Sequence, residues 1–398
     1  MRGRLRPRRR DGGPRGRPGP GSGPVSAVIT DWTAVSPYGR GRAEFAAGIL
    51  GDRTAVTALD PAGWTGPPMT EVARAPIGAP REVLGRKGTR AMDRATAMAV
   101  LAAGDLLPGE PAAPDASDAA DAQAAAERTA LVLGISTGPV AALTTFTADS
   151  FTGDRPYLVD AARFPAALMN YTAGQMAIWH HVRGPNSTVA AGRTAGLAAL
   201  RYALRLLRAG RADTVLCGAV EEFSAERAWL EWHAAQDRVR PPVLGEGCAM
   251  LRLTRSDLAS TEGAPVFEVA AVESGLAEDE PRDAARVLER CARSALAKAG
   301  VTPDEIGLVV PGEAPDAAGE AEADALAALF GGRPPRTTGC ARRIGDTRAA
   351  SAAFQMAAVL AHAERAPGAR PALITTVDRD GPVACAVLRP AARQGPDT

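Results

Sequence analysis

Residues 186–207, NSTVAAGRTAGLAALRYALRLL, combine residue types that could present a reactive group. A β-branched run leads into a tight Ala-Ala-Gly turn, and an amphipathic helix follows the turn. In acyl-transfer enzymes this geometry places a nucleophile at a helix N-terminus, where the helix dipole favours a thiolate. The residue presented here is Arg193, and a guanidinium has no electron pair with which to attack a carbonyl. The turn therefore predicts the place of an acyl-transfer site without its nucleophile.

A second motif, GISTG at 134–138, matches the G-x-S-x-G nucleophile elbow that follows a strand. Ser136 would then attack, with one of four histidines as its base: His180, His181, His233 or His362. No HGGG-type oxyanion loop precedes the motif. A histidine late in a helix is commonplace, because a cation is favoured there, and the two histidines beside Arg183 are expected on the surface. A Ser136 hydrolase is therefore kept only as an alternative.

The cysteines are odd in number and widely spaced, and no C-x-x-C pair or histidine at ligand spacing accompanies them. They are Cys217, Cys248, Cys291, Cys340 and Cys385. Several of them sit in apolar runs, which is typical of buried thiols in a reducing cytoplasm. We expect neither a disulfide framework nor a metal site.

The elements that must position the turn follow from hydrophobic periodicity. Continuous apolar runs at 129–137, 212–223 and 241–253 predict strands buried on both faces. Helical periodicity over 90–107 and 280–300 falls between such runs. Alternating strands and helices predict an α/β protein, and two halves of similar order predict an internally duplicated five-layer fold.

We place the N-terminal half at 25–255 and the C-terminal half at 256–392. The segment 108–128 is rich in Pro, Ala and Asp, and we expect a solvated connection there. Residues 393–398 are expected to form a disordered tail.

The charge is unevenly distributed along the 398 residues, whose formal net charge is +1. Residues 1–24 hold eight Arg and one Asp, and the remainder carries 38 basic and 44 acidic residues. The body is therefore mildly acidic and is not expected to bind nucleic acid, while the basic tail is expected to be disordered. No apolar stretch approaches the roughly 20 residues that span a bilayer, and no signal-peptide core is present, so a cytoplasmic protein is expected.

The segment 183–221, RGPNSTVAAGRTAGLAALRYALRLLRAGRADTVLCGAVE, resembles the nucleophile region of β-ketoacyl synthases. In that family an R-G-P turn precedes T-V-(S/A)-T-A-C-(T/S)-S-G, a helix and a strand ending in (E/D). VSAVITDWTAVSPYG at 25–39, AMDRATAMAVLAA at 91–103 and PVLGEGCAMLRL at 242–253 resemble further family segments in the family's order. The resemblance covers nearly the whole chain outside its tails and implies the thiolase-like, duplicated five-layer αβαβα fold.

The resemblance also implies which positions would be catalytic, and this sequence departs from the family at each of them. The family's nucleophilic cysteine falls on Arg193, and its first histidine falls on Pro311. Its lysine falls on Ala341 and its second histidine on Asp346. Condensation needs a thiolate and two imidazole donors for the enolate, and these residues supply none of them.

An arginine at a helix N-terminus is disfavoured by the helix dipole and should have a carboxylate partner. Because the family's cysteine and second histidine face each other, we predict that Arg193 and Asp346 form a buried ion pair that closes the pocket. Distances above about 6 Å between the two side chains would contradict this pairing.

Homologues without the cysteine are the chain-length factors, the β subunits of type II polyketide ketosynthases, and this sequence resembles them. The resemblance implies a heterodimer with a catalytic ketosynthase and a growing chain on an acyl carrier protein, whose phosphopantetheine carries it. It implies no cofactor of the chain's own and a tunnel at the dimer interface that limits chain length. Chain-length factors usually have Gln or Glu at the cysteine position, a feature sometimes linked to malonyl decarboxylation. Arg193 departs from that pattern and argues against such a role, so a residual malonyl decarboxylase or priming subunit is kept only as an alternative. Whether the product is aromatic or a polyene stays open.

The family's dimer interface includes the helix that follows GISTG. At helical spacing Val140, Leu143, Thr144 and Thr147 share one face of that helix. Phe164, Met169 and Asn170 fall near the same pseudo-twofold axis in the family. These seven residues are predicted to belong to the tunnel or to the interface. For the four on the helix, tunnel lining and ordinary interface packing both stay open.

Overall fold

The computed structural model describes most of the chain, and the predicted tails 1–24 and 393–398 lie outside the described residues. The described residues are 26–107, 116–161, 163–235, 242–259, 267–278, 281–333, 335–366 and 368–391.

The N-terminal half is built on a sheet in the order β6-β5-β7-β9-β1. Its strands are β1 (Ala27–Ser36), β5 (Thr129–Ile135), β6 (Asn186–Ala190), β7 (Thr214–Glu221) and β9 (Gly247–Arg255). β5 is parallel to β6 and β7, whereas β7 and β1 are antiparallel to β9. Strands β5, β7 and β9 are almost wholly buried, as their continuous apolar sequences predict.

The C-terminal half repeats the pattern in the order β11-β12-β13-β10. Its strands are β10 (Phe267–Leu276), β11 (Leu308–Val310), β12 (Ala372–Val377) and β13 (Pro382–Pro390). The two sheets meet through a short antiparallel contact, in which Val28 lies opposite Glu268 and Ile29 opposite Phe267.

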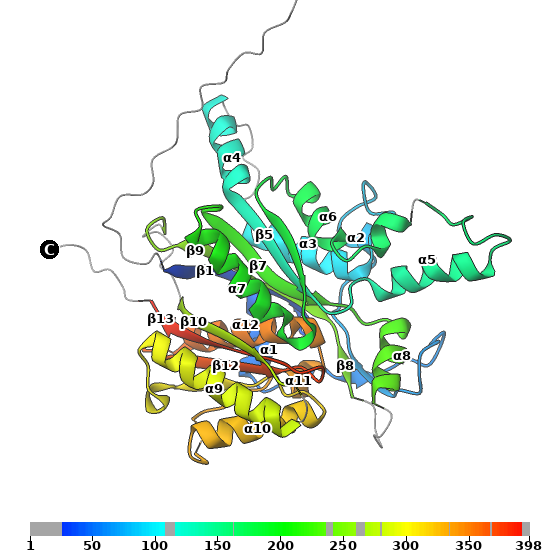
Figure 1. The fold of residues 1–398 in the computed structure, drawn as a ribbon. Helices are drawn as coiled ribbons and strands as arrows, with labels where there is room; N and C mark the ends of the chain where they lie inside the picture. Colours follow the sequence, from blue (N-terminus) through cyan, green and yellow to red (C-terminus); the bar gives the residue numbers. More distant parts are fainter. Residues whose placement is uncertain are drawn as a thin grey trace, which may run out of the picture.

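Helices fill the space between the two sheets and cover their outer faces (Figure 1). In the middle layer α7 (Ala195–Arg208) packs on β5 and β7, and α12 (Ser351–Arg365) packs on β9, β12 and α7. Helices α3 (Arg94–Leu106) and α6 (Tyr171–Trp179) cover the N-terminal sheet, and α9 (Pro281–Ala299) and α10 (Ala317–Leu329) cover the other. The helix-sheet-helix-sheet-helix order confirms the predicted five-layer α/β fold.

The remaining elements connect or flank these layers. They are β2 (Gly39–Arg40), α1 (Arg42–Leu50), β3 (Thr57–Ala58), β4 (Glu71–Ala73), α2 (Pro80–Val83), α4 (Ala116–Arg128), α5 (Val140–Thr152), η1 (Phe164–Ala167), η2 (Gly192–Thr194), α8 (Ala225–Ala234), β8 (Leu244–Gly245), η3 (Pro303–Glu305), α11 (Ala341–Ile344) and η4 (Arg348–Ala350). β3, β4 and β8 form a small separate sheet. Helix α5 projects from the body beside α8 (Figure 1).

Within the connection predicted over 108–128, residues 120–128 are mostly exposed, as expected of a solvated segment, but residues 116–128 form the helix α4. Its Ala, Gln, Glu and Arg residues are good helix formers, and their summed propensity outweighs the composition signal taken from the prolines before them. Residues 108–115 lie outside the described residues.

All five cysteines are buried free thiols, as predicted, and burial raises the pKa of each. None of the helices within the described residues is long and apolar enough to cross a membrane.

Candidate functional site

The turn that leads into α7 is shaped by Gly192. β6 ends at Ala190, and η2 then carries Arg193 into the molecule before α7 begins at Ala195. Gly192 has φ +52°, and a Cβ there would overlap the carboxylate of Asp378. Glycine is therefore required both by the left-handed backbone and by the close approach of the carboxylate.

Arg193 and Asp346, which the sequence analysis paired, are in contact in the structure. Arg193 Nη2 donates to Asp346 Oδ2, and the two side chains are only 3% and 4% exposed. Asp346 Oδ1 accepts a second hydrogen bond, at 2.9 Å, from the Arg348 backbone amide. The guanidinium that stands at the entrance of α7 is thus held by a fully buried carboxylate.

The electrostatics of this pair follow from burial and mutual attraction. Burial alone would raise the pKa of Asp346, but the charges of Arg193 and Arg227 and the hydrogen bonds lower it to about 2. Burial lowers the pKa of Arg193, but the charge and hydrogen bond of Asp346 together with the charges of Glu231 and Asp378 outweigh that effect, so the pKa lies above its ordinary value. Both groups are therefore ionised at neutral pH.

Asp378 is a third member of the site, and it was not among the residues predicted from the sequence. Its Oδ2 accepts a 2.6 Å hydrogen bond from the Arg193 backbone amide, and the side chain is buried. In acyl transfer such an amide would stabilise an oxyanion, whereas here a carboxylate of the chain already occupies it. The only sequence signal was its position directly after a buried strand, β12.

A wider charge network surrounds these residues. We define it as Arg193, Arg227, Arg348, Arg379, Glu231, Asp346 and Asp378. Glu231 accepts from Arg348 Nη1 at 2.6 Å and from Arg379 Nη2, although burial opposes its ionisation. Arg227 donates at 2.8 Å to the backbone oxygen of Asp346. Cations and carboxylates therefore alternate through the region, which explains how so many charges are buried together.

The other two positions implied by the resemblance carry no ionisable side chain. Pro311 follows β11 and is half-buried, and Ala341 begins the short helix α11. Next to Pro311, the amides of Gly312 and Glu313 donate to the Glu322 carboxylate at 2.9 and 3.0 Å. Burial raises the pKa of Glu322 to about 7.

The predicted interface residues lie on α5, on η1 and in the turn before α6. Leu143, Phe164 and Met169 are 46%, 50% and 49% exposed, and Thr144, Thr147 and Asn170 are exposed as well. The Phe146 and Phe164 rings pack at 5.7 Å, which joins α5 to η1. Val140 was predicted on the same face as Leu143, Thr144 and Thr147, but it differs from them in exposure. It lies in the first turn of α5 and is buried, whereas the other three are exposed.

Three of the four histidines proposed as bases for Ser136 are engaged elsewhere, and the fourth, His181, is exposed, as expected. His180 Nε2 lies 2.8 Å from the Val100 backbone oxygen, so this half-buried ring packs against α3. The surface position predicted for His180 is therefore wrong. His362 contacts Thr338, and His233 stacks on Trp229. The Ser136 hydroxyl lies 3.4 Å from Thr137 Oγ1, and within the described part of the chain no imidazole hydrogen-bonds to it.

A five-layer fold with a helix entering its centre from an edge strand defines the thiolase-like class. A model of the beta-ketoacyl synthase N-terminal domain matches residues 26–259, and a model of the C-terminal domain matches residues 264–366. These matches cover most of the sequence, and the chain belongs to the β-ketoacyl synthase family.

Individual relatives show which members of the family the chain is similar to. The solved ishigamide ketosynthase/chain length factor is 43% identical, covers 92% of this chain and 100% of its own, and superposes with a TM-score of 0.81. The tetracenomycin polyketide synthase ketoacyl synthase beta subunit of Streptomyces glaucescens is 31% identical over 52% of this chain and 56% of its own length. The corresponding alpha subunit is 30% identical over 60% of each. Within the family, the chain is thus similar to ketosynthase/chain-length-factor proteins of type II polyketide synthases.

The first curated relatives are matched over only 40 to 60% of their own length. A beta-ketoacyl synthase from Burkholderia phymatum superposes with a TM-score of 0.78 at 20% identity, which supports the fold alone.

Proposed function

We propose that this chain is the chain-length-factor subunit of a type II polyketide synthase. In this role it pairs with a catalytic ketosynthase, helps to shape the tunnel that receives the growing chain, and performs no condensation itself. The observation that carries the proposal is the buried contact of Arg193 with Asp346 at the entrance of α7. A guanidinium and a carboxylate stand where the family resemblance puts the thiolate and an imidazole donor.

The charge network argues against condensation for three separate reasons. Arg193 offers no nucleophile, and its side chain is held by Asp346. The adjacent amide is occupied by Asp378, so an acyl oxyanion would have to displace a buried carboxylate. The negative charge of Asp346 would also repel a malonyl carboxylate that approached the same place.

The partner assignment is supported by the relatives and by two surfaces. The ishigamide neighbour is described as a ketosynthase/chain length factor, and a structural neighbour at 18% identity is a ketosynthase in complex with its acyl carrier protein. Within the described part of the chain, strand β6 ends the sheet with an unpaired edge, and α5 and η1 present exposed apolar residues such as Leu143, Phe151 and Phe164. Both features suit a chain that completes its structure against another subunit.

The direct test is reconstitution. The chain, a co-expressed ketosynthase, and malonyl-loaded acyl carrier protein are combined, and elongated products are measured by mass spectrometry. We expect products only when both subunits are present. Arg193→Cys alone should remain inactive, because Pro311 and Ala341 still supply no imidazole or amine; condensation by the isolated chain would contradict the proposal.

The residual decarboxylase role needs its own assay. The ketosynthase cysteine is replaced by Ala, and release of carbon dioxide from malonyl-loaded carrier protein is followed with and without this chain. Release that depends on the presence of this chain would favour the decarboxylase. Equal release in both mixtures would favour the purely structural role.

A further inference from the structure

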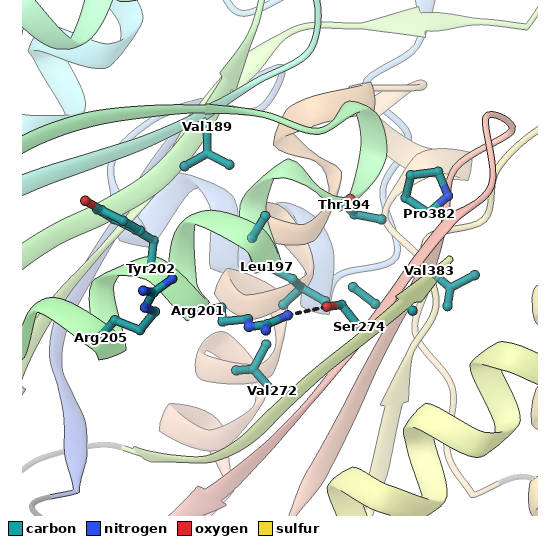
Figure 2. A pocket seen from close by; sticks show the side chains of 13 residues that line it. Val189, Thr194, Leu197, Arg201, Tyr202, Arg205, Val272, Ser274, Pro382 and Val383 are labelled. Carbon is teal, nitrogen blue, oxygen red and sulfur yellow. Dashed lines mark hydrogen bonds between the residues drawn. The ribbon is translucent and has the colours of Figure 1, made fainter. Parts of the chain in front are cut away.

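A cavity of about 320 Å³ opens beside α7, where this helix passes between β6 and the paired strands β10 and β13 (Figure 2). We call it the α7 groove and define it by Val189, Leu197, Arg201, Tyr202, Arg205 and Val272. It is separate from the charge network, none of whose members lines it.

The groove has an apolar floor and a cationic rim. Val189, Leu197 and Val272 form apolar walls, and Leu197 is fully buried. Arg201 and Arg205 lie one helical turn apart on α7, and both side chains are exposed. No carboxylate lines the groove, so these two like charges face it together without a counter-charge.

The two arginines differ in how they are held. Arg201 Nη1 donates to Ser274 Oγ at 2.5 Å, which aims the guanidinium across the groove towards β10 (Figure 2). The Arg205 side chain has no hydrogen-bond or ion-pair partner among the described residues, although its backbone oxygen accepts from the Ala209 amide. One guanidinium is therefore positioned, and the other keeps its full donor capacity.

The groove is continuous with the open edge of the N-terminal sheet. Val189 belongs both to the groove wall and to β6, which pairs with β5 and has no strand on its other side in the described part of the chain. A protein that covers this edge would reach the groove at Val189, and if it extended over the rim it would remove water from Arg201 and Arg205. Such burial is unfavourable unless the covering surface brings carboxylates of its own.

We propose that the α7 groove seats an acidic segment of the ketosynthase partner, with a carboxylate between Arg201 and Arg205 and an apolar side chain against Val189 and Leu197. The proposal rests on the heterodimer proposed above and adds the chemistry of one contact within it. Guanidinium groups bind carboxylates through paired hydrogen bonds, so the contact would fix register as well as add affinity.

Affinity of purified chain for its co-expressed ketosynthase, measured by biolayer interferometry, tests this contact. Arg205→Glu reverses the free charge, and Ala198→Trp fills the groove without changing charge. Arg208→Glu is the matched control, because Arg208 is exposed on the same helix but does not line the groove. Circular dichroism and thermal unfolding of each variant check that the fold is intact.

We expect Arg205→Glu to weaken assembly by about 30-fold or more, since it places two carboxylates together in a covered site. Ala198→Trp should weaken assembly as well, and Arg208→Glu should leave it near the wild-type value. The wild-type affinity should also fall more steeply with salt than that of Arg205→Gln.

Three results would overturn the proposal. If wild type and Arg205→Glu assemble equally, the groove is not part of the contact, although the heterodimer stands. If wild type does not assemble with any ketosynthase, this proposal and the proposed function fall together. If Arg205→Glu assembles normally but loses binding of acyl carrier protein, the groove serves that protein instead.

Discussion

The backbone amide of Arg193 donates a 2.6 Å hydrogen bond to Asp378 Oδ2, so a carboxylate of the chain occupies the turn that leads into α7. The same residue uses its side chain to hold Asp346. Arg193 therefore joins two carboxylates from different segments through two different groups. Because Arg193 holds both carboxylates, breaking either contact should lower the stability of the folded protein.

The first prediction concerns the Arg193–Asp346 pair. Arg193→Met should lower the free energy of unfolding by about 3–5 kcal/mol, because it leaves a buried carboxylate uncompensated. The double variant Arg193→Met/Asp346→Leu should lose much less than the sum of the single variants. Urea denaturation of the four proteins at pH 7 measures the coupling.

The control for this double-mutant cycle is the ion pair of Arg40 with Asp105, which is 2.6 Å long and more exposed. Arg40→Met should cost no more than about 1 kcal/mol. Strict additivity of the Arg193 and Asp346 variants would show that the buried contact contributes nothing of its own.

The second prediction concerns Gly192, whose φ of +52° and proximity to Asp378 leave no room for a Cβ. Gly192→Ala should lower the melting temperature, because the change strains the backbone and displaces the carboxylate. Gly174→Ala in α6 is the matched control, since nothing lies within 4 Å of its added Cβ, and it should be neutral or stabilising by up to about 1 kcal/mol. Equal effects of the two substitutions would rule out a special role for the turn.

The contact between Arg193 and Asp346 could be anticipated from sequence because both fall in segments that the family resemblance aligns. The fold class could also be predicted from the sequence, because buried strands such as β5 and β7 are continuous apolar runs. The role of Asp378 could not be predicted from the sequence. Its carboxylate reaches Arg193 only through the packing of the two sheets around α7, which no local spacing reports.

Val140 was predicted at the tunnel or interface and His180 on the surface, and for both residues long-range packing changed the outcome. Helical spacing places Val140 on the face of Leu143, but burial depends on what covers the first turn of α5. His180 follows α6 in sequence, yet its contact is the carbonyl oxygen of Val100 on α3. Periodicity thus predicts which residues share a face, whereas long-range packing decides what that face meets.

The third prediction concerns pH and Glu222. Burial, followed by the charges of Asp93 and Glu221, raises the pKa of Glu222 from 4.5 to about 8. The folded protein therefore holds this proton more tightly than the unfolded chain, so stability falls as pH rises from about 4.5 and levels off above about 8. The slope from this group is at most about 1.4 kcal/mol per pH unit.

Glu222→Gln should remove that contribution, because the amide mimics the protonated acid. Urea denaturation between pH 5 and pH 9 should give a flatter stability curve for this variant than for wild type. Glu44→Gln, at an exposed position of α1, should leave the wild-type curve unchanged. Parallel curves for wild type and Glu222→Gln would mean that Glu222 titrates normally.

The last prediction tests whether α5 borders the tunnel in the proposed heterodimer. Leu143 is 46% exposed, so Trp can replace it without opening the core of this chain, whereas Trp at the buried Val140 would disrupt folding. If Leu143 faces the tunnel, the larger side chain shortens the available space, and the reconstituted enzyme should release shorter products. Thr145→Trp, on the opposite side of α5, should leave product length unchanged. Product length is read by mass spectrometry, and assembly of each variant with the ketosynthase is measured in parallel. Wild-type products from a fully assembled Leu143→Trp complex would assign Leu143 to interface packing and not to the tunnel wall.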